Sequence, residues 1–481
     1  MGLLDALKDI LGISPVNIGD LNRRATYERP QPPIPVVTHD PLEGIEITDE
    51  YRAVKTLLEE GFPIVFVSGK AGTGKSTLIH YLRHVFKKNV VVVAPTGVAA
   101  INVKGTTIHS FFCFPPKVVT DEDIKEVKDR RLYAILDLLI VDEISMVRAD
   151  LMDAMDKFLR LNGRYSDKPF GGVQLLFVGD LFQIPPVVNR EEEAVLLARP
   201  YKSEFFFSSK ALQNCQLTPI ELTKVYRQSD STFMNMLNKI RVAEDLESVI
   251  PSINAECCGR PESKDSITLT CTNVTADQIN TAELRKLPGK SRTFTGEVSG
   301  KFAVKDAKLP SPLNLTIKPH AQVMFTKNDS QKRWVNGTLG RVTAIKKASI
   351  QVELLTNGAI HEVQRAEWDS YKYEYDYVED KIKTVVSGRY IQYPLMLAWA
   401  ITIHKSQGKT LEKVCVDLGD GAFASGQVYV ALSRCRSLAD LSLARPIYIS
   451  EVKCDERIKR FYLAIVELQT QPSDHTTDRQ S

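Results

Sequence analysis

The sequence lacks the features that mark several protein classes. Its apolar runs are well short of the roughly 20 residues of a membrane-spanning helix, and its start lacks the pattern of a secretory signal. The eight cysteines are scattered without a CxxC pair, so neither a zinc site nor a disulfide framework is predicted. Lys and Arg exceed Asp and Glu by only three residues, so net charge alone does not indicate a nucleic-acid partner. We therefore expect a protein of a reducing compartment, without a membrane partner.

The two ends of the 481-residue chain differ from its body. Apolar residues at helical spacing over residues 3–11, followed by the proline-rich residues 30–35, predict a short helix and an extended linker within residues 1–45. We interpret the helix as docked on the body, with a membrane-surface or partner-binding role as the alternative. The polar residues 466–481 predict a disordered tail. The apolar content of 43% between these ends is sufficient for several domain cores.

A glycine-rich stretch separates an apolar run, residues 64–67, from a helical pattern that starts near residue 75. Free backbone N–H groups and glycines at a helix start bind phosphate oxygens, so we interpret this stretch as a phosphate-binding loop rather than a chance glycine-rich turn. Lys75 is expected to reach the β- and γ-phosphates and the Ser76 hydroxyl to hold Mg²⁺. The predicted nucleotide-binding residues are Gly69, Ala71, Gly72, Thr73, Gly74, Lys75, Ser76 and Thr77.

Polar side chains follow two further strand-like runs. Asp142 and Glu143 come directly after residues 138–141, and Gln183 follows residues 175–178. Ligands bind at the carboxyl ends of parallel strands, so we predict Mg²⁺ at Asp142, water activation at Glu143 and γ-phosphate sensing at Gln183. The alternative for the acidic pair is a solvated strand end.

Alternation of strands and helices restarts beyond residue 215, with candidate strands at 267–270 and 414–417, and predicts a second α/β domain. Short strands and turns between 315 and 390 predict a small inserted β-barrel. Four tyrosines alternate over residues 371–377 and so share one strand face. We interpret this face as barrel wall, with base stacking as the alternative.

Ten short segments in this order resemble the petite integration frequency (Pif) family of superfamily 1 DNA helicases and its RecD-like relatives. They are GKAGTGKST (69–77), APTGVAA (94–100), TIHSFF (107–112), VDEISM (141–146), FGGVQ (170–174), GDLFQIPP (179–186), VYRQ (225–228), VNGTLG (335–340), AITIHKSQG (400–408) and YVALSR (429–434).

The resemblance implies two RecA-like P-loop domains with parallel sheets flanked by helices, an α/β fold. The first would cover residues 46–205 with a wedge insertion at about 113–131. The second would combine residues 206–314 and 391–465 around the β-barrel at 315–390. The family places ATP between these domains, with Arg227 and Arg434 opposite the phosphate loop and Gln407 and Gly408 also at the nucleotide.

The resemblance also implies a set of DNA contacts. They are Pro95, Thr96, His109, Ser110, Phe111, Thr272, Asn273, His404, Lys405 and Ser406. Two adjacent aromatics point in different directions, so at least one of Phe111 and Phe112 is expected in the core. The sequence departs from the family at Tyr51, where many helicases carry an adenine-reading glutamine, so strict preference for ATP is not predicted.

The function we predict is an ATP- and Mg²⁺-dependent DNA helicase that moves 5′ to 3′ along single-stranded DNA and unwinds forked or tailed duplexes. The direction and a monomeric state in solution are implied by the family alone. We expect an intracellular protein, in the cytoplasm or nucleoid of a bacterium or in the nucleus of a eukaryote. The alternatives are a RecD-like motor subunit of a larger complex, a nucleotide-gated DNA clamp without unwinding, and an RNA-directed motor.

Overall fold

The structure is a computed structural model that describes residues 45–470, except 187, 189–191, 193–195, 197–200, 214, 229, 261–264 and 303–308. The predicted N-terminal helix and proline-rich linker lie outside the described residues, as does the tail after Thr470. Among the helices within this part of the chain, none combines the length and the apolar character needed to cross a bilayer.

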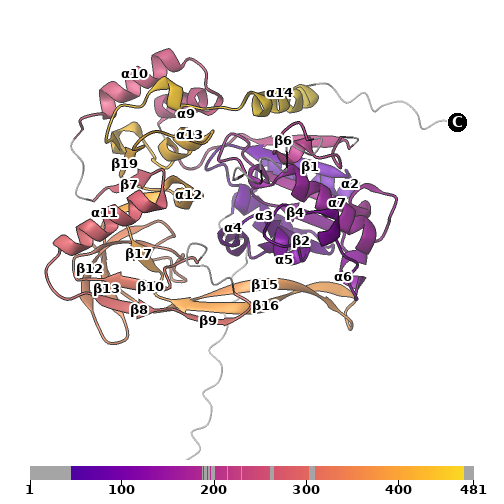
Figure 1. Cartoon of the computed structure of the whole chain (residues 1–481), viewed down its shortest axis with the longest axis horizontal. Coiled ribbons are helices and arrows are strands. Elements are labelled where there is room, and N and C mark those ends of the chain that lie inside the picture. Colours follow the sequence, from indigo (N-terminus) through magenta and orange to yellow (C-terminus); the bar gives the residue numbers. More distant parts are fainter. Residues whose placement is uncertain are drawn as a thin grey trace, which may run out of the picture. The chain divides into compact units, whose positions relative to one another are not determined.

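A six-stranded sheet forms the centre of the first half (Figure 1). Its strand order is β3-β2-β4-β5-β1-β6, and every neighbouring pair is parallel. The strands are β1 (Ile64–Gly69), β2 (Val90–Ala94), β3 (Thr106–Thr107), β4 (Leu138–Val141), β5 (Gln174–Gly179) and β6 (Leu217–Leu222). The four central strands β1, β2, β4 and β5 lie where continuous apolar runs predicted buried strands, because such runs suit strands covered on both faces.

The strand β6 corrects the predicted end of the first domain at residue 205. It pairs with β1 at the edge of the first sheet. Its sequence contains Pro219, which lacks a backbone N–H and is tolerated at a sheet edge. The proline and the half-buried pattern distinguish β6 from the continuous apolar runs of the central strands, so the sequence did not predict this strand.

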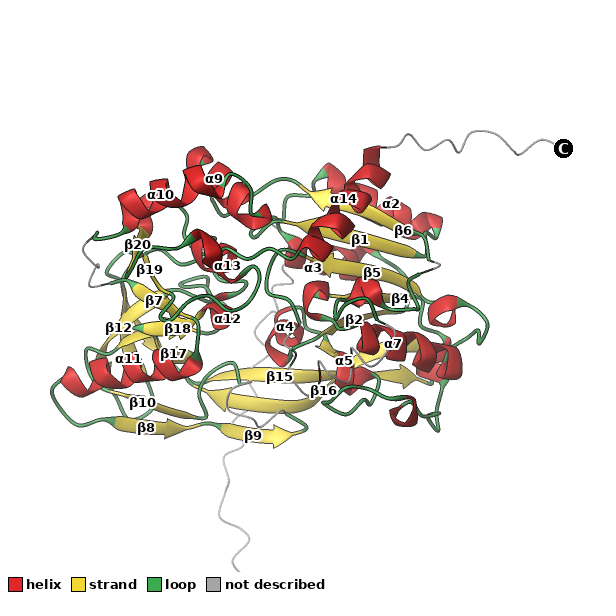
Figure 2. Cartoon of the chain, turned by 45° about the horizontal axis from the view of Figure 1, so that its top comes forward, coloured by secondary structure: helices red, strands yellow, loops and turns green. Residues whose placement is uncertain are grey.

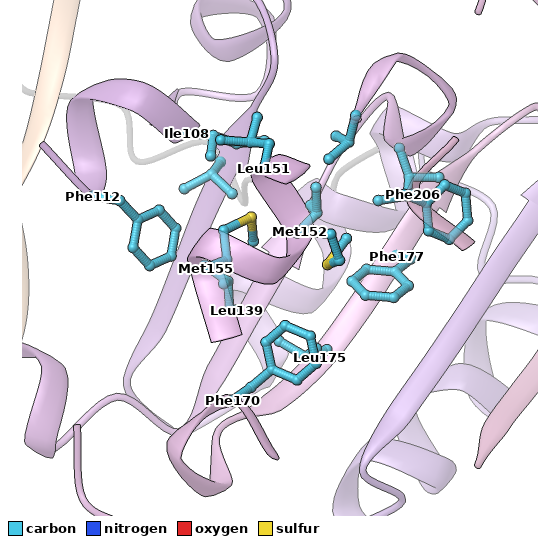
Figure 3. Close-up of a cluster of buried hydrophobic side chains, with 14 of the residues drawn as sticks. Ile108, Phe112, Leu139, Leu151, Met152, Met155, Phe170, Leu175, Phe177 and Phe206 are labelled. Carbon is cyan, nitrogen blue, oxygen red and sulfur yellow. The ribbon is translucent and has the colours of Figure 1, made fainter. Parts of the chain in front are cut away.

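Helices cover both faces of the first sheet. They are α2 (Asp49–Glu60), α3 (Lys75–Val85), α4 (Gly97–Asn102), α5 (Ile108–Phe111), α6 (Arg131–Ala134) and α7 (Ala149–Asn162). The Thr48 side chain caps the start of α2, and Gly61, which follows its last residue, adopts the left-handed conformation. Figure 3 shows Met152 and Met155 of α7 packed among Leu139, Leu175 and surrounding aromatic rings.

A four-stranded parallel sheet forms the second half, in the order β18-β7-β19-β20. Its strands are β7 (Ile267–Thr270), β18 (Ala400–Thr402), β19 (Val414–Asp417) and β20 (Leu441–Leu443). Its helices are α9 (Ser231–Val242), α10 (Leu246–Cys257), α11 (Asn273–Lys286), α12 (Ile403–Ser406) and α13 (Gln427–Leu432). The candidate strands at 267–270 and 414–417 are confirmed, and the halves together give the predicted pair of RecA-like α/β domains.

The inserted β region is larger than the predicted range 315–390. A five-stranded antiparallel sheet, in the order β14-β13-β12-β11-β17, lies beside the strand pair β8-β10. The strands are β8 (Arg292–Thr295), β10 (Asn314–Ile317), β11 (Gln322–Phe325), β12 (Leu339–Ile345), β13 (Ile350–Leu354), β14 (Ile360–Val363) and β17 (Leu395–Leu397). The region therefore begins near residue 292 and ends near 397.

A long hairpin corrects the interpretation of the alternating tyrosines as barrel wall. Strands β15 (Ala366–Asp376) and β16 (Lys381–Gln392) pair along their length, and β9 (Glu297–Gly300) joins β16. An 11-residue strand spans about 36 Å, so the hairpin leaves the small sheet and reaches the first half (Figure 2). There the buried Tyr373 hydroxyl accepts a hydrogen bond of 3.0 Å from Val92 N, and the ring joins the first core.

The last helix also differs from its predicted place in the second domain. Helix α14 (Glu456–Thr470) packs Ile458 and Ile465 into the core of the first half. The Phe461 ring stacks on Phe207 with a centroid distance of 4.2 Å. These apolar residues recur at helical spacing, so they form one stripe that covers the first sheet. The helix continues past residue 466, where the tail was predicted to begin.

Candidate nucleotide site and nucleic-acid interface

The predicted phosphate loop lies between β1 and α3, with two glycines in the left-handed region. The φ angles are +84° at Gly72 and +87° at Gly74, values that favour glycine. A Cβ on Gly72 would lie 2.6 Å from the Cβ of Arg227, so this glycine also allows a close approach of the second half. The Lys75 ammonium donates to the carbonyl oxygens of Gly69 at 2.7 Å and Lys70 at 3.0 Å. The loop thus curls around its own lysine at the start of a helix.

The acidic pair lies at the carboxyl end of β4, as predicted. Burial and the neighbouring Glu143 carboxylate raise the pKa of Asp142 to about 7. Burial likewise raises the pKa of Glu143, although the charge of Lys75 opposes the shift. The Glu143 Oε2 atom is buried without a hydrogen-bond partner among the described residues. A buried, unpartnered carboxylate oxygen beside a second carboxylate suits a site for a cation and a water molecule.

Gln183 lies near the end of β5 and is held by the carboxylate that precedes it. Its Nε2 donates to Asp180 Oδ2 at 3.1 Å. Both side chains are buried, with exposed fractions of 5% for Gln183 and 0% for Asp180. The orientation of the amide is therefore set by Asp180.

Two arginines of the second half lie opposite the loop without a carboxylate partner. The Arg434 side chain is 1% exposed and donates to Ser433 Oγ and to the carbonyls of Val430, Ser406 and Lys409. Burial, reinforced by Arg227, lowers the pKa of Arg434 to about 9. Within the described part of the chain, neither arginine forms an ion pair.

Arg227 shows the same pattern closer to the phosphate loop. Its guanidinium donates to neutral groups: Thr410 Oγ1 at 3.0 Å, Gly408 O at 3.4 Å and Ser433 O at 3.5 Å. Burial lowers the pKa of Arg227 to about 10. Because buried charges are normally paired, these two arginines indicate the place of an anion.

A further observation, independent of the arginines, also indicates that a magnesium nucleotide would fit between the halves. The Gln407 Nε2 atom is buried and lacks a hydrogen-bond partner within the described residues. Loop amides, Lys75 and the two arginines could hold the phosphates, while the exposed Ser76 hydroxyl and Asp142 offer the oxygen ligands that Mg²⁺ prefers.

Tyr51 stands where many helicases carry an adenine-reading glutamine. Its hydroxyl forms a hydrogen bond within the protein. It donates to Gly74 O at 2.7 Å, and its ring is 2% exposed and stacks on Tyr81. Burial raises the pKa of Tyr51 to about 12, so the hydroxyl remains a donor. Its hydrogen is therefore directed at the phosphate loop and not at a base.

Most of the predicted DNA contacts lie at helix starts that follow parallel strands. Thr96 caps α4 and Thr272 caps α11, each accepting from a backbone N–H of its helix. The exposed members are Ser110, Thr272, Asn273 and Lys405, whereas Pro95, Thr96, His109 and His404 are half-buried. Both halves thus contribute residues that match the expected phosphate-contacting type.

Two predicted DNA contacts point inward. Phe111 and Phe112 are 6% and 1% exposed and meet edge to face, so neither ring presents a face for base stacking. The expectation that at least one of the two rings lies in the core is confirmed, and Phe111, which was expected at the DNA, is buried as well. Phe111 lies against Tyr133 and the hairpin residue Tyr373, and Phe112 lies against Phe158. Ser406 is fully buried and donates to Ile403 O at 2.7 Å, so its hydroxyl closes α12.

Sequence reasoning missed three residues that join the halves beside the nucleotide site: Asp180, Arg241 and Tyr429. Asp180 and Tyr429 lie inside segments that carried the resemblance, yet neither was given a role. Arg241 lies in an ordinary amphipathic helix, where an arginine normally faces solvent. The sequence feature that could have revealed them is Asp180, an acidic residue at the end of a buried strand. Once the strand is covered, this carboxylate needs a buried cation as its partner.

Two parallel α/β sheets that bring a phosphate loop and unpaired arginines to one cleft define a P-loop ATPase of the two-domain RecA-like type. Residues 47–249 match the model of the PIF1-like helicases. The chain belongs to this family of ATP-dependent DNA helicases.

Similar proteins cover nearly the whole chain. The human ATP-dependent DNA helicase PIF1 is 34% identical over 453 residues, which are 91% of this chain and 67% of the human protein. Pif1 of Bacteroides sp in complex with ADP-AlF4 is 34% identical with a TM-score of 0.80, covering 88% of this chain and 98% of that one. Bacteroides Pif1 bound to ssDNA is 35% identical over the same shares, with a TM-score of 0.63.

Proposed function

We propose that this protein uses ATP hydrolysis to move 5′ to 3′ along single-stranded DNA and to unwind tailed or forked duplexes. The observation that carries the proposal is the pair of buried, unpaired arginines, Arg227 and Arg434, on the half opposite the phosphate loop. Hydrolysis then needs both halves, and each cycle of closing and opening changes the distance between two groups of DNA contacts. The direction rests on the family.

The residues at the nucleotide take distinct roles in this proposal. Lys75 and the loop amides bind the β- and γ-phosphates, while Ser76 and Asp142 hold Mg²⁺. Bound Mg²⁺ would neutralise charge on the phosphate oxygens. Glu143 takes a proton from the attacking water, and its raised pKa brings it closer to neutral pH, where a general base works best.

The remaining polar groups act on the γ-phosphate. Gln183 contacts it, and Arg227 and Arg434 stabilise the charge that spreads over its oxygens during transfer. Gln407 and Gly408 lie beside the arginines, where the unpartnered Gln407 amide offers a further donor.

Single-stranded DNA is proposed to cross both halves at the helix starts. Pro95, Thr96, His109 and Ser110 would contact it from the first half, and Thr272, Asn273, His404 and Lys405 from the second. Bacteroides Pif1 bound to ssDNA supports this partner, and its lower TM-score supports a rearrangement of this chain on DNA. The segment at 113–131 is proposed as the strand-separating wedge.

An unwinding assay tests direction and activity together. We expect release of a strand from a partial duplex with a 5′ tail and not from the matched 3′-tailed duplex, with Lys75→Ala as the inactive control. Hydrolysis without release would favour a DNA clamp, and release of the 3′-tailed duplex alone would reverse the direction. Release only after a nuclease partner is added would favour the RecD-like subunit.

We propose that the protein acts as a monomer. A similar solved structure concerns DNA unwinding at forked dsDNA by two coordinating Pif1 helicases. Forked substrates are therefore the ones on which the monomer should be tested. A rate of unwinding per protein that stays constant as protein concentration rises would support the monomer, and a steep rise would contradict it.

A further inference from the structure

The Asp180 carboxylate forms a buried joint between the halves. From its own half it accepts the Phe182 backbone N–H at 3.3 Å and Gln183 Nε2 at 3.1 Å. From the second half it accepts Arg241 Nη2 at 3.0 Å, Arg241 Nε at 3.2 Å and the Tyr429 hydroxyl at 3.3 Å. A fully buried carboxylate thus has donors on both oxygens, and those of Arg241 and Tyr429 come from the second half.

Arg241 supplies the counter-charge of this joint. Its side chain is 4% exposed, and its guanidinium lies 4.4 Å from the centre of the Phe182 ring and 5.3 Å from that of Tyr462 on α14. Burial by itself would raise the pKa of Asp180, but the charges of Arg241 and Lys75 lower it. Asp180 therefore remains an acceptor for the Gln183 amide.

The joint extends to the phosphate loop through Tyr429. While its hydroxyl donates to Asp180, the same oxygen accepts the Ala71 backbone N–H at 3.3 Å. Tyr429 belongs to α13, the helix that leads to Arg434. One carboxylate therefore connects the loop, Gln183 and the helix before an arginine of the site.

We propose that Arg241 is a positioning residue that couples γ-phosphate sensing to closure of the two halves. By pairing with Asp180 from the second half, Arg241 fixes the Gln183 amide and, through Tyr429, the Ala71 amide of the phosphate loop. The inference rests on the proposed function, because it needs Gln183 to act on the γ-phosphate. Arg241 itself touches neither nucleotide nor DNA in this proposal.

The first test replaces the charged guanidinium with the shorter, neutral amide of glutamine. For Arg241→Gln we expect kcat for DNA-stimulated ATP hydrolysis to fall by about 10- to 100-fold, as for partners that orient a reacting group. We also expect the preference for AMP-PNP over ADP, measured as a ratio of Kd values, to fall by about tenfold. Equal weakening of both nucleotides would contradict the inference, since a merely structural role lacks γ-phosphate selectivity.

A double variant separates positioning from stability. Asp180→Asn combined with Arg241→Gln removes the unpaired buried charge, so Tm should return toward that of the parent protein. The kcat and the nucleotide preference should stay low, because an amide at 180 offers a single acceptor oxygen. Recovery of kcat to within about twofold together with Tm would overturn the inference.

Arg457 provides the matched control. It also makes paired hydrogen bonds to a carboxylate, Glu204, at 3.1 Å each, and lies 5.0 Å from the Phe205 ring centre. Arg457→Gln should leave the AMP-PNP to ADP preference unchanged. Loss of the preference in this variant as well would show a general effect of losing any arginine–carboxylate pair and would overturn the inference. A parent protein without DNA-stimulated hydrolysis would instead refute the proposed function itself.

Discussion

The two sides of the nucleotide cleft bury charge in opposite ways. On the first half, burial raises the pKa values of Asp142 and Glu143, so the ionised acids are disfavoured. On the second half, burial lowers the pKa values of Arg227 and Arg434, so the cations are disfavoured. Each side is therefore strained by its own charges. It follows from this difference that a ligand bound between the two sides must present positive charge to the acids and negative charge to the arginines.

A magnesium nucleotide has this distribution of charge. Its metal would face Asp142, and its phosphates would face the arginines and Lys75. The pair of Arg241 and Asp180 differs, because each charge already has its partner within the protein. Buried charges without an ion-pair partner thus indicate where the ligand binds, and buried charges that are paired indicate where the two halves contact each other.

The largest effect is expected from the cationic side. Arg434→Ala should reduce DNA-stimulated ATP hydrolysis by about 10³- to 10⁵-fold, as for an arginine finger, because it removes one of the two cations that the second half directs at the γ-phosphate. Nucleotide binding should persist through the phosphate loop. Arg436→Ala, an exposed arginine two residues later, is the control. Equal loss of hydrolysis and binding in Arg434→Ala would remove it from this role.

On the acidic side, Glu143→Gln should lower kcat by about 10²- to 10⁴-fold, the usual contribution of a general base. The amide keeps the shape of the side chain but cannot take a proton from water. Single-turnover hydrolysis measures the chemical step directly, and binding of ATP with Mg²⁺ should be retained. Normal hydrolysis in this variant would assign the base to another residue.

A smaller effect is expected on the thermal stability of the nucleotide-free protein, which the buried carboxylates lower. Asp142→Asn removes one buried carboxylate from the acidic pair, so the nucleotide-free protein should melt about 2–6 °C higher. The same variant should lose the additional stabilisation that Mg²⁺ gives to the nucleotide complex. Thermal melting with and without Mg²⁺ and ADP measures both. A lower Tm without ligand would show that the acids stabilise the empty cleft, contrary to the comparison.

The smallest effect lies outside the cleft, at the exposed Lys405. If this residue contacts a DNA phosphate, Lys405→Ala should weaken single-strand binding for all sequences alike. The slope of log affinity against log salt should decrease in magnitude by about one. Fluorescence anisotropy across a salt series measures the slope, with exposed Lys210→Ala, near the end of the first half, as the control. An unchanged slope would exclude a phosphate contact at Lys405.

Local sequence patterns predicted the elements that hold the site. Continuous apolar runs identified β1, β2, β4 and β5, because strands of a covered parallel sheet are apolar throughout. The renewed alternation of strands and helices identified β7 and β19. The residues at their carboxyl ends followed from the same pattern. Asp142 and Gln183 lie where this reasoning placed them.

Contacts between distant segments could not be predicted in the same way. The tyrosine alternation revealed a shared strand face but not that Tyr373 would cover the first core. The residues of α14 were assigned to the second domain because they follow it along the chain, although their apolar stripe covers the first sheet. Arg241 was missed for the same reason, because its partner Asp180 is 61 residues away.

The return of the last helix limits how the cleft can move. The chain passes between the halves once after β6 and again between Val452, packed in the second core, and Ile458, packed in the first. Six residues extend to about 20 Å at most. Together with the hairpin of β15 and β16, whose Tyr373 is buried in the first core, these two connections oppose sliding of the halves past each other, because sliding would pull α14 and the hairpin out of that core.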